Sequence, residues 1–180
     1  MRTKLTNKGC KNYCIVEAHT NPEINSKATT TIEREIVRNQ EQSQFLKRVL
    51  IVDDEPNITF SFKVGLDSYY HENKRIFEVY TYNNPSVALS EFKTNFYDLL
   101  LTDINMPTIN GFDLSQKILE LDSNIRVCFM SAAEVNTEGL GEVYPKVNFG
   151  YFIKKPVEIE YLAKRLLAIF NSSRMDQYDR

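Results

Sequence analysis

Acidic residues follow two strand-like segments of the sequence at the point where each segment ends. Asp53 and Asp54 come directly after the apolar run VLIV, and Asp103 follows LLLT. Because ligands of an open parallel sheet bind beyond the carboxyl ends of the strands, we expect these three carboxylates to converge on one edge. Two carboxylates about 4 Å apart repel by roughly 4 kcal/mol at an effective dielectric constant near 20. A hard divalent cation would reverse the sign of this energy, and Mg²⁺ fits the set best, since it binds one or two carboxylates and keeps waters for a phosphate.

Two further strand ends supply groups that phosphate chemistry needs. Ser131 follows the segment RVCFM and offers a hydroxyl donor, while Lys155 follows YFIK, precedes Pro156 and offers a cation. A carboxylate can attack phosphorus and form an aspartyl phosphate when a metal ion and an ammonium group neutralise the gathering charge. The strand ends together therefore indicate phosphoryl chemistry on an aspartate.

Segments of strand-like and helix-like period alternate from residue 47 onwards. The strand-like segments are 48–52, 76–80, 98–102, 126–130 and 151–153. Helices are expected from Pro56, Pro85, Gly111 and Ile159, because apolar residues recur at 3.6-residue spacing after each of these positions. The residues expected to face the core are Ile58, Phe62, Leu66 and Tyr69; Val87, Ala88 and Phe92; Leu114, Ile118 and Leu121; and Leu162, Leu166 and Ile169. This alternation predicts an α/β fold with right-handed crossovers, a doubly wound five-stranded parallel sheet.

Composition narrows the class of protein. With 180 residues, of which 42% are hydrophobic and 12% aromatic, the chain can bury a proper core. Residues 1–46 hold 7 basic and 5 acidic residues and the remainder holds 15 and 19, so neither part has the basic stripe of a nucleic-acid-binding domain. Three cysteines argue against a disulfide framework and favour the cytoplasm. No stretch approaches the length of a membrane span, so no membrane insertion is expected.

The two ends of the chain are expected to lie outside this core. Residues 1–46 are rich in Thr, Asn, Lys, Glu and Gln and are interpreted as an extension, mostly disordered or loosely helical. Its Cys10, Cys14 and His19 could supply three zinc ligands, but no fourth ligand is obvious and a polar tail is the simpler interpretation. Residues 47–171 form the expected domain and 172–180 a short tail. Because no second domain follows Phe170, output by protein contact is expected.

The ordered set of strand-end residues resembles the receiver domain of two-component response regulators. The resemblance covers residues 47–170 and rests on Asp53-Asp54, on Asp103 within LLLTDINMPTINGFDL, on Ser131 and on Lys155-Pro156. It implies a flavodoxin-like fold with strand order 2-1-3-4-5 and Asp103 as the phosphoacceptor. It also implies that Asp54, Asp103 and the carbonyl of Asn105 bind Mg²⁺ directly, and that Asp53 binds it through water. Lys155 would hold the phosphoryl group. Ser131 and Phe152 would be the switch pair.

The resemblance further implies a function. The chain would be a single-domain response regulator that takes its phosphoryl group from a sensor histidine kinase or phosphotransfer protein and signals to a further protein, with or without forming a homodimer. It would be a self-phosphorylating switch that loses its phosphoryl group by itself, and not a turnover enzyme. Two departures from the family stand out: extra residues in YYHENKRIFEVY, interpreted as a surface extension, and the segment 134–148, where Gly139, Gly141 and Pro145 interrupt any helix.

Other classes of protein fit less well. A phosphatase of the acid-dehalogenase type also uses a strand-end aspartate with Mg²⁺, but it needs a second acid two residues later, where this chain has Asn105. No complete phosphate-binding or dinucleotide-binding glycine motif is present, and with only His19 and His71 a Ser-His-Asp hydrolase has little support. The more serious alternative is a receiver-shaped scaffold that binds partners without phosphorylation.

Overall fold

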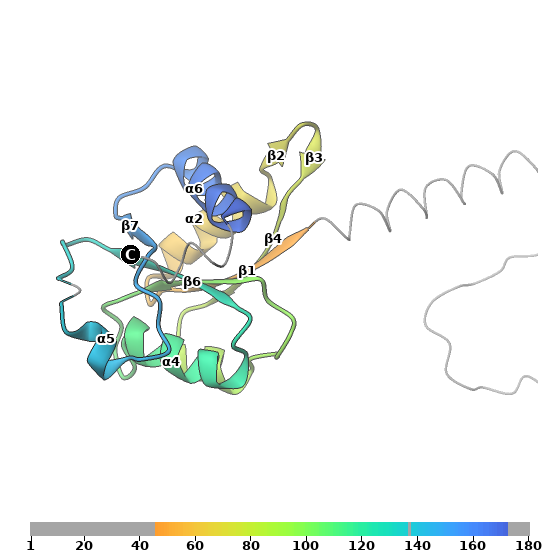
Figure 1. Ribbon diagram of the computed structural model, residues 1–180. Coiled ribbons are helices and arrows are strands. Elements are labelled where there is room, and N and C mark those ends of the chain that lie inside the picture. Colours follow the sequence, from red (N-terminus) through yellow and green to blue (C-terminus); the bar gives the residue numbers. More distant parts are fainter. Residues whose placement is uncertain (1–45, 137, 173–180) are drawn as a thin grey trace, which may run out of the picture. The chain divides into compact units, whose positions relative to one another are not determined.

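The computed structural model describes residues 46–136 and 138–172, which form one α/β unit (Figure 1). The expectations for residues 1–45, including the set of Cys10, Cys14 and His19, lie outside the described residues, and so does most of the expected tail. None of the helices in the described part of the chain has the length and apolar composition that a membrane crossing requires.

Five parallel strands form the sheet. They are β1 (Lys47–Val52), β4 (Phe77–Tyr82), β5 (Leu99–Asp103), β6 (Arg126–Ser131) and β7 (Phe152–Lys154), arranged in the order β4-β1-β5-β6-β7. Counted along the chain, this is the order 2-1-3-4-5, which confirms the expected fold class. The register pairs Val49 of β1 with Val79 of β4 and with Leu99 of β5. Residues 49–52 and 99–103 are all buried, as expected for strands covered on both faces.

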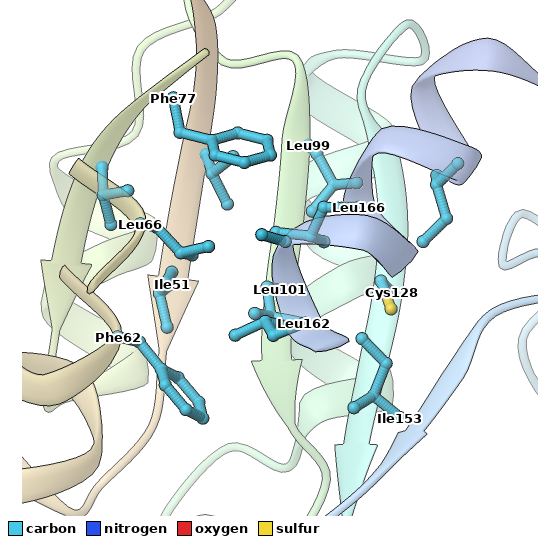
Figure 2. Packing of buried hydrophobic residues seen from close by; sticks show 14 of the residues in the cluster. Ile51, Phe62, Leu66, Phe77, Leu99, Leu101, Cys128, Ile153, Leu162 and Leu166 are labelled. Atoms are coloured by element: carbon cyan, nitrogen blue, oxygen red, sulfur yellow. The ribbon is translucent and has the colours of Figure 1, made fainter. Parts of the chain in front are cut away.

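Helices cover both faces of the sheet. They are α2 (Pro56–Asp67), α3 (Pro85–Ser90), α4 (Gly111–Leu121), α5 (Leu140–Val143) and α6 (Ile159–Asn171). Helices α2 and α6 lie on one face, and α4 and α5 lie on the other (Figure 1). Figure 2 shows the core beneath α2 and α6, where Phe62, Leu66, Leu162 and Leu166 pack against side chains of the strands. A second core, which includes Phe112, Leu114, Ile118 and Phe129, lies on the opposite face.

The predicted core positions on the helices are correct for most residues, and two of them are wrong. Val87 is 40% exposed and Leu121 is 52% exposed, although their spacing placed both on the apolar side. Helix α3 ends at Ser90 after six residues, and Val87 lies in its first turn, away from the sheet. Leu121 is the last residue of α4, beyond the part of the helix that the sheet covers. Phe92 lies beyond α3 and still packs against the core.

The extra residues expected between the first two strands form a hairpin. Strands β2 (Tyr70–His71) and β3 (Lys74–Arg75) pair antiparallel, and all four residues are exposed. Glu72 and Asn73 between them both have positive φ angles, of 50° and 62°, as a two-residue hairpin turn with the twist of the strands requires. Among the described residues between β6 and β7, the one helix is the single-turn α5, preceded by Gly139 at a φ of 77°.

Candidate functional site

One ammonium group joins two acids at the carboxyl edge of the sheet. Asp53 follows β1, Asp103 ends β5 and Lys155 follows β7. The Nζ of Lys155 lies 2.7 Å from Oδ2 of Asp53 and 2.6 Å from Oδ1 of Asp103. The two carboxylates are buried, with 0% of the Asp53 residue and 6% of Asp103 exposed. The expected convergence of residues from three strands is therefore present for these three side chains.

The second oxygen of each acid is held by its own loop. Oδ1 of Asp53 accepts a hydrogen bond of 3.0 Å from the amide of Glu55, and Oδ2 of Asp103 accepts one of 2.8 Å from the amide of Asn105. Aspartate readily makes this turn with the amide two residues on, which is one reason why it suits a strand end. Each carboxylate is thus fixed at one oxygen by the backbone and at the other by Lys155.

Burial and pairing shift the pKa values of this set. Burial raises the pKa of Asp53 above its ordinary value of 3.8, and this effect exceeds the opposite effect of the hydrogen bonds from Lys155 and the Glu55 amide. Burial alone would lower the pKa of Lys155, but the hydrogen bonds to Asp103 and Asp53 outweigh it, and the pKa rises above 10.5. Lys155 is therefore a cation at neutral pH, in contact with two acids.

Two backbone features hold these ends together. The amide of Lys155 donates a hydrogen bond of 2.8 Å to the carbonyl of Ser131, so the chain after β7 stays fastened to the end of β6. A Cβ atom on Gly111 would lie 2.2 Å from the carbonyl oxygen of Asp103. Only glycine lets the start of α4 pass this close to the end of β5. The sequence pattern identified Gly111 as a helix start but not as a close approach to the site.

The other predicted site residues surround this contact. Asp54 is partly exposed and Asn105 is exposed, both next to the buried acids in the sequence. Ser131 is buried, and its hydroxyl donates to the carbonyl of Ala133 at 2.8 Å and accepts from the amide of Ala133 at 3.1 Å. Phe152 is half-buried, with its ring centroid 5.4 Å from that of Phe129. The side chain of Ser131 thus bonds to Ala133 and that of Phe152 packs on Phe129, and neither contacts the acids.

One residue at this edge has a role that the sequence analysis did not predict. Asn83 follows β4, and its Nδ2 donates hydrogen bonds to the backbone carbonyl of Asp53 at 2.8 Å and to the hydroxyl of Thr59 at 2.7 Å. The strand expected at 76–80 extends to Tyr82 in the structure, which places Asn83 directly at its end. An asparagine beside a second asparagine carries no signal in the sequence that distinguishes such a role.

The donor set suits a hard cation. Among the described residues, no three Asp, Glu, His or Cys side chains are close enough together to hold a metal ion as they stand. The Lys155 ammonium contacts the carboxylates of both Asp53 and Asp103. Asp53, Asp54 and Asp103 nevertheless outnumber the one ammonium group, and their oxygens are the ligands that Mg²⁺ prefers. The residues therefore fit a divalent cation that balances the surplus negative charge.

Comparison with known proteins decides the family. A model of the response regulator receiver domain matches residues 49–167. The chain belongs to the response regulator receiver domain family. Receiver domains are signalling modules of two-component systems, so the resemblance in the sequence is confirmed at the level of family and fold.

Relatives and solved structures agree with this membership. The chain is 28% identical over 124 residues to the response regulator ArlR of Staphylococcus aureus, covering 69% of this chain and 52% of ArlR. It therefore spans about half the length of the curated relatives it matches. The non-phosphorylated HemR receiver domain from Leptospira biflexa is similar at 25% identity, with a TM-score of 0.58 over 71% of this chain and 97% of that one. A CheY-like receiver domain protein from Methanospirillum hungatei shares the fold, with 24% identity and a TM-score of 0.59 over 70% of this chain and 94% of that one.

Proposed function

We propose that this chain is a phosphorylation switch that accepts a phosphoryl group on Asp103. The donor would be a sensor histidine kinase or phosphotransfer protein in the cytoplasm, and the signal would pass on by contact with a further protein. The observation that carries the proposal is the placement of the Lys155 ammonium 2.6 Å from a carboxylate oxygen of Asp103, which is itself almost fully buried.

The chemistry follows from the two oxygens of Asp103. One carboxylate oxygen attacks the phosphorus, a new P–O bond forms, and the bond between phosphorus and the donor breaks with its electron pair leaving on the donor. The Lys155 ammonium lies beside Oδ1 of Asp103 and can balance the charge of the acyl phosphate. The Asn105 amide donates to Oδ2 and keeps the carboxylate oriented. Asp53, Asp54, Asp103 and the Asn105 carbonyl would hold Mg²⁺, which when bound neutralises charge on the transferring group.

The product is a modified state of the protein and not a released molecule. An acyl phosphate is a reactive mixed anhydride, so the switch would return to its resting state by hydrolysis without a second enzyme. This supports a self-phosphorylating switch and not a turnover enzyme. The receiver domain would comprise residues 47–171, with residues 1–46 as an extension and 172–180 as a tail.

Intact mass after incubation with Mg²⁺ and a small phosphoryl donor such as acetyl phosphate tests the proposal. We expect one added phosphoryl group that is stable in acid and labile in base, and we expect Asp103→Asn to abolish it. Labelling of the Asp103→Asn variant at another residue would overturn the assignment of Asp103. Absence of labelling in the wild type with several donors would favour the receiver-shaped scaffold that works without phosphorylation.

A further inference from the structure

A polar cluster outside the acid set fastens the loop that carries Asp54. The side-chain amide of Asn83 donates one hydrogen bond to the carbonyl of Asp53 at 2.8 Å and the other to the hydroxyl of Thr59 at 2.7 Å. The hydroxyl of Thr59, which is only 3% exposed as a residue, donates in turn to the carbonyl of Pro56 at 3.0 Å. The end of β4 is thereby tied to the end of β1 and to the first turn of α2.

These bonds bracket Asp54. The carbonyl before it, that of Asp53, is held by Asn83, and the carbonyl of Pro56 two residues after it is held by Thr59. The carbonyl of Glu55 accepts from the amides of Ile58 and Thr59 at 3.1 and 3.2 Å. Within residues 46–136 and 138–172, no hydrogen bond or ion pair to the Asp54 side chain is found. The position of its carboxylate is therefore set by the backbone on either side.

We infer that Asn83 and Thr59 are positioning residues for the cation-binding face of this site. The inference rests on the proposed function, because Asp54 matters here as a ligand of Mg²⁺. The side-chain amide nitrogen of asparagine carries two hydrogens and can donate two hydrogen bonds at once. Asn83 can therefore bind a backbone carbonyl and a hydroxyl together. Without it, both acceptors lose this donor, and the turn from β1 to α2 loses its side-chain tie to the end of β4.

Removing the Asn83 side chain should mainly lower the affinity of the site for Mg²⁺. Outer partners of metal ligands typically change metal affinity by 10–100-fold when they are removed. Because Asn83 acts through the backbone of a ligand and not on its carboxylate, we expect the dissociation constant for Mg²⁺ to rise by about tenfold in Asn83→Ala, at the lower end of that range. Thr59→Val, which removes only the hydroxyl, should give a smaller rise, and Thr59→Ser should restore wild-type affinity.

Calorimetric titration of the unphosphorylated full chain with MgCl₂ measures these affinities. The matched control is Asn84→Ala, one residue further on. The Asn84 side chain accepts hydrogen bonds from the amides of Ser86 and Val87 at the start of α3 and does not touch Asp53. Its loss should lower stability while leaving Mg²⁺ affinity unchanged. The double variant Asn83→Ala, Thr59→Val should bind no more weakly than Asn83→Ala alone, because both changes break one chain of contacts.

Two further readouts separate positioning from a merely structural role. Amide hydrogen exchange without metal should rise in residues 53–57 of Asn83→Ala but not of Asn84→Ala. In phosphorylation by acetyl phosphate, Asn83→Ala should need about tenfold more Mg²⁺ for half-maximal rate and should keep the maximal rate. Wild-type Mg²⁺ affinity together with unchanged exchange in Asn83→Ala would overturn this inference and leave the proposed function standing. A wild-type chain that binds no Mg²⁺ would instead overturn the proposed function, and this inference with it.

Discussion

Lys155 contacts two buried carboxylates, and replacing it should lower the free energy of unfolding. In Lys155→Met, Asp53 and Asp103 lose the cation that lies within 2.7 Å of both. Removing one partner of a buried pair leaves uncompensated charge, so we expect the free energy of unfolding to fall by about 3 kcal/mol at neutral pH. Urea unfolding of both proteins measures this difference. The control is Lys164→Met on α6, where the exposed pair with Glu160 should contribute nothing measurable.

The same pair of proteins should show a specific pH dependence. Because the folded-state pKa of Asp53 is raised above 3.8, the folded state binds a proton more tightly than the unfolded chain, and stability falls as pH rises from about 3.8 through the raised value. Lys155, whose pKa is raised above 10.5, stays charged throughout this window. The deficit of Lys155→Met should therefore shrink as pH falls through the window, since neutral Asp53 needs no cation. A deficit that grows towards acid would contradict this assignment.

At the level of residues, the sequence was informative where a side chain with distinctive chemistry ends a strand. Asp53, Asp103 and Lys155 were predicted to converge and do so, because each lies at the carboxyl end of a parallel strand. Asn83 also ends a strand but resembles its neighbour Asn84, which caps α3 and has no part in the acid contact. Only the folded structure distinguishes the two amides.

At the level of elements, side chains cover the open edge of the sheet. Strand β4 is an edge strand, and three of its outward backbone groups have side-chain partners. The carbonyl of Phe77 accepts from Nε of Arg75 at 3.1 Å, and the amide of Val79 donates to Oδ1 of Asp67 at 3.0 Å. The carbonyl of Val79 accepts from Nζ of Lys63. Lys63 and Asp67 come from α2 and Arg75 comes from the hairpin, so α2 and the hairpin together cover the edge of β4.

Asp67→Ala should uncover this edge. The amide of the buried Val79 would lose its acceptor, and the ion pairs of Asp67 with Lys63 and Arg75 would be lost as well. We expect the free energy of unfolding to fall by about 2 kcal/mol, because an unsatisfied buried donor costs 1–3 kcal/mol. An unpaired strand edge also invites pairing with another chain. Urea unfolding and sedimentation velocity measure both effects.

The matched control for this prediction is Glu160→Ala, which breaks an ion pair on α6 that touches no strand edge. It should change neither stability nor the sedimentation coefficient. If Asp67→Ala were destabilised but kept the same sedimentation coefficient at high concentration, the side chains that cover β4 would stabilise the fold without preventing association.

The period of apolar residues predicted α2, α4, α6 and all five strands, because each has a sustained pattern that the sheet then buries. It also predicted the start of α3 at Pro85, but not its end, because the chain leaves the helix after Ser90. There Phe92, Phe96 and Tyr97 form a cluster of tilted and edge-on rings, and Asn95 takes a positive φ of 57°. Such packing among residues of one loop has no period, so the sequence pattern could not distinguish it from a longer helix.

At the level of the whole molecule, an aromatic cluster connects β6, which ends at Ser131, with the segment that follows it. The ring of Phe129 in β6 lies 4.9 Å from Phe112, 5.9 Å from Phe149 and 5.4 Å from Phe152, measured between centroids. Phe149 also contacts Tyr144, which follows the single-turn helix α5. A movement of Ser131 at the end of β6 would therefore meet rings that hold the segment 140–152 in place.

Phosphorylation should accordingly be detected in residues 131–152. The hydroxyl of Ser131 now bonds to Ala133, and a phosphoryl oxygen on Asp103 would offer it a stronger, charge-assisted acceptor. The loop would move inward, Phe152 would turn into the vacated space, and the population would shift towards a more ordered segment. Amide hydrogen exchange with and without beryllofluoride, a mimic of the phosphoryl group, measures this shift in the presence of Mg²⁺. Protection should rise in 131–152 and barely change in α2, and Ser131→Ala should abolish the rise while Mg²⁺ still binds. A rise mainly in α2 or α3 would place the output surface away from the segment 131–152.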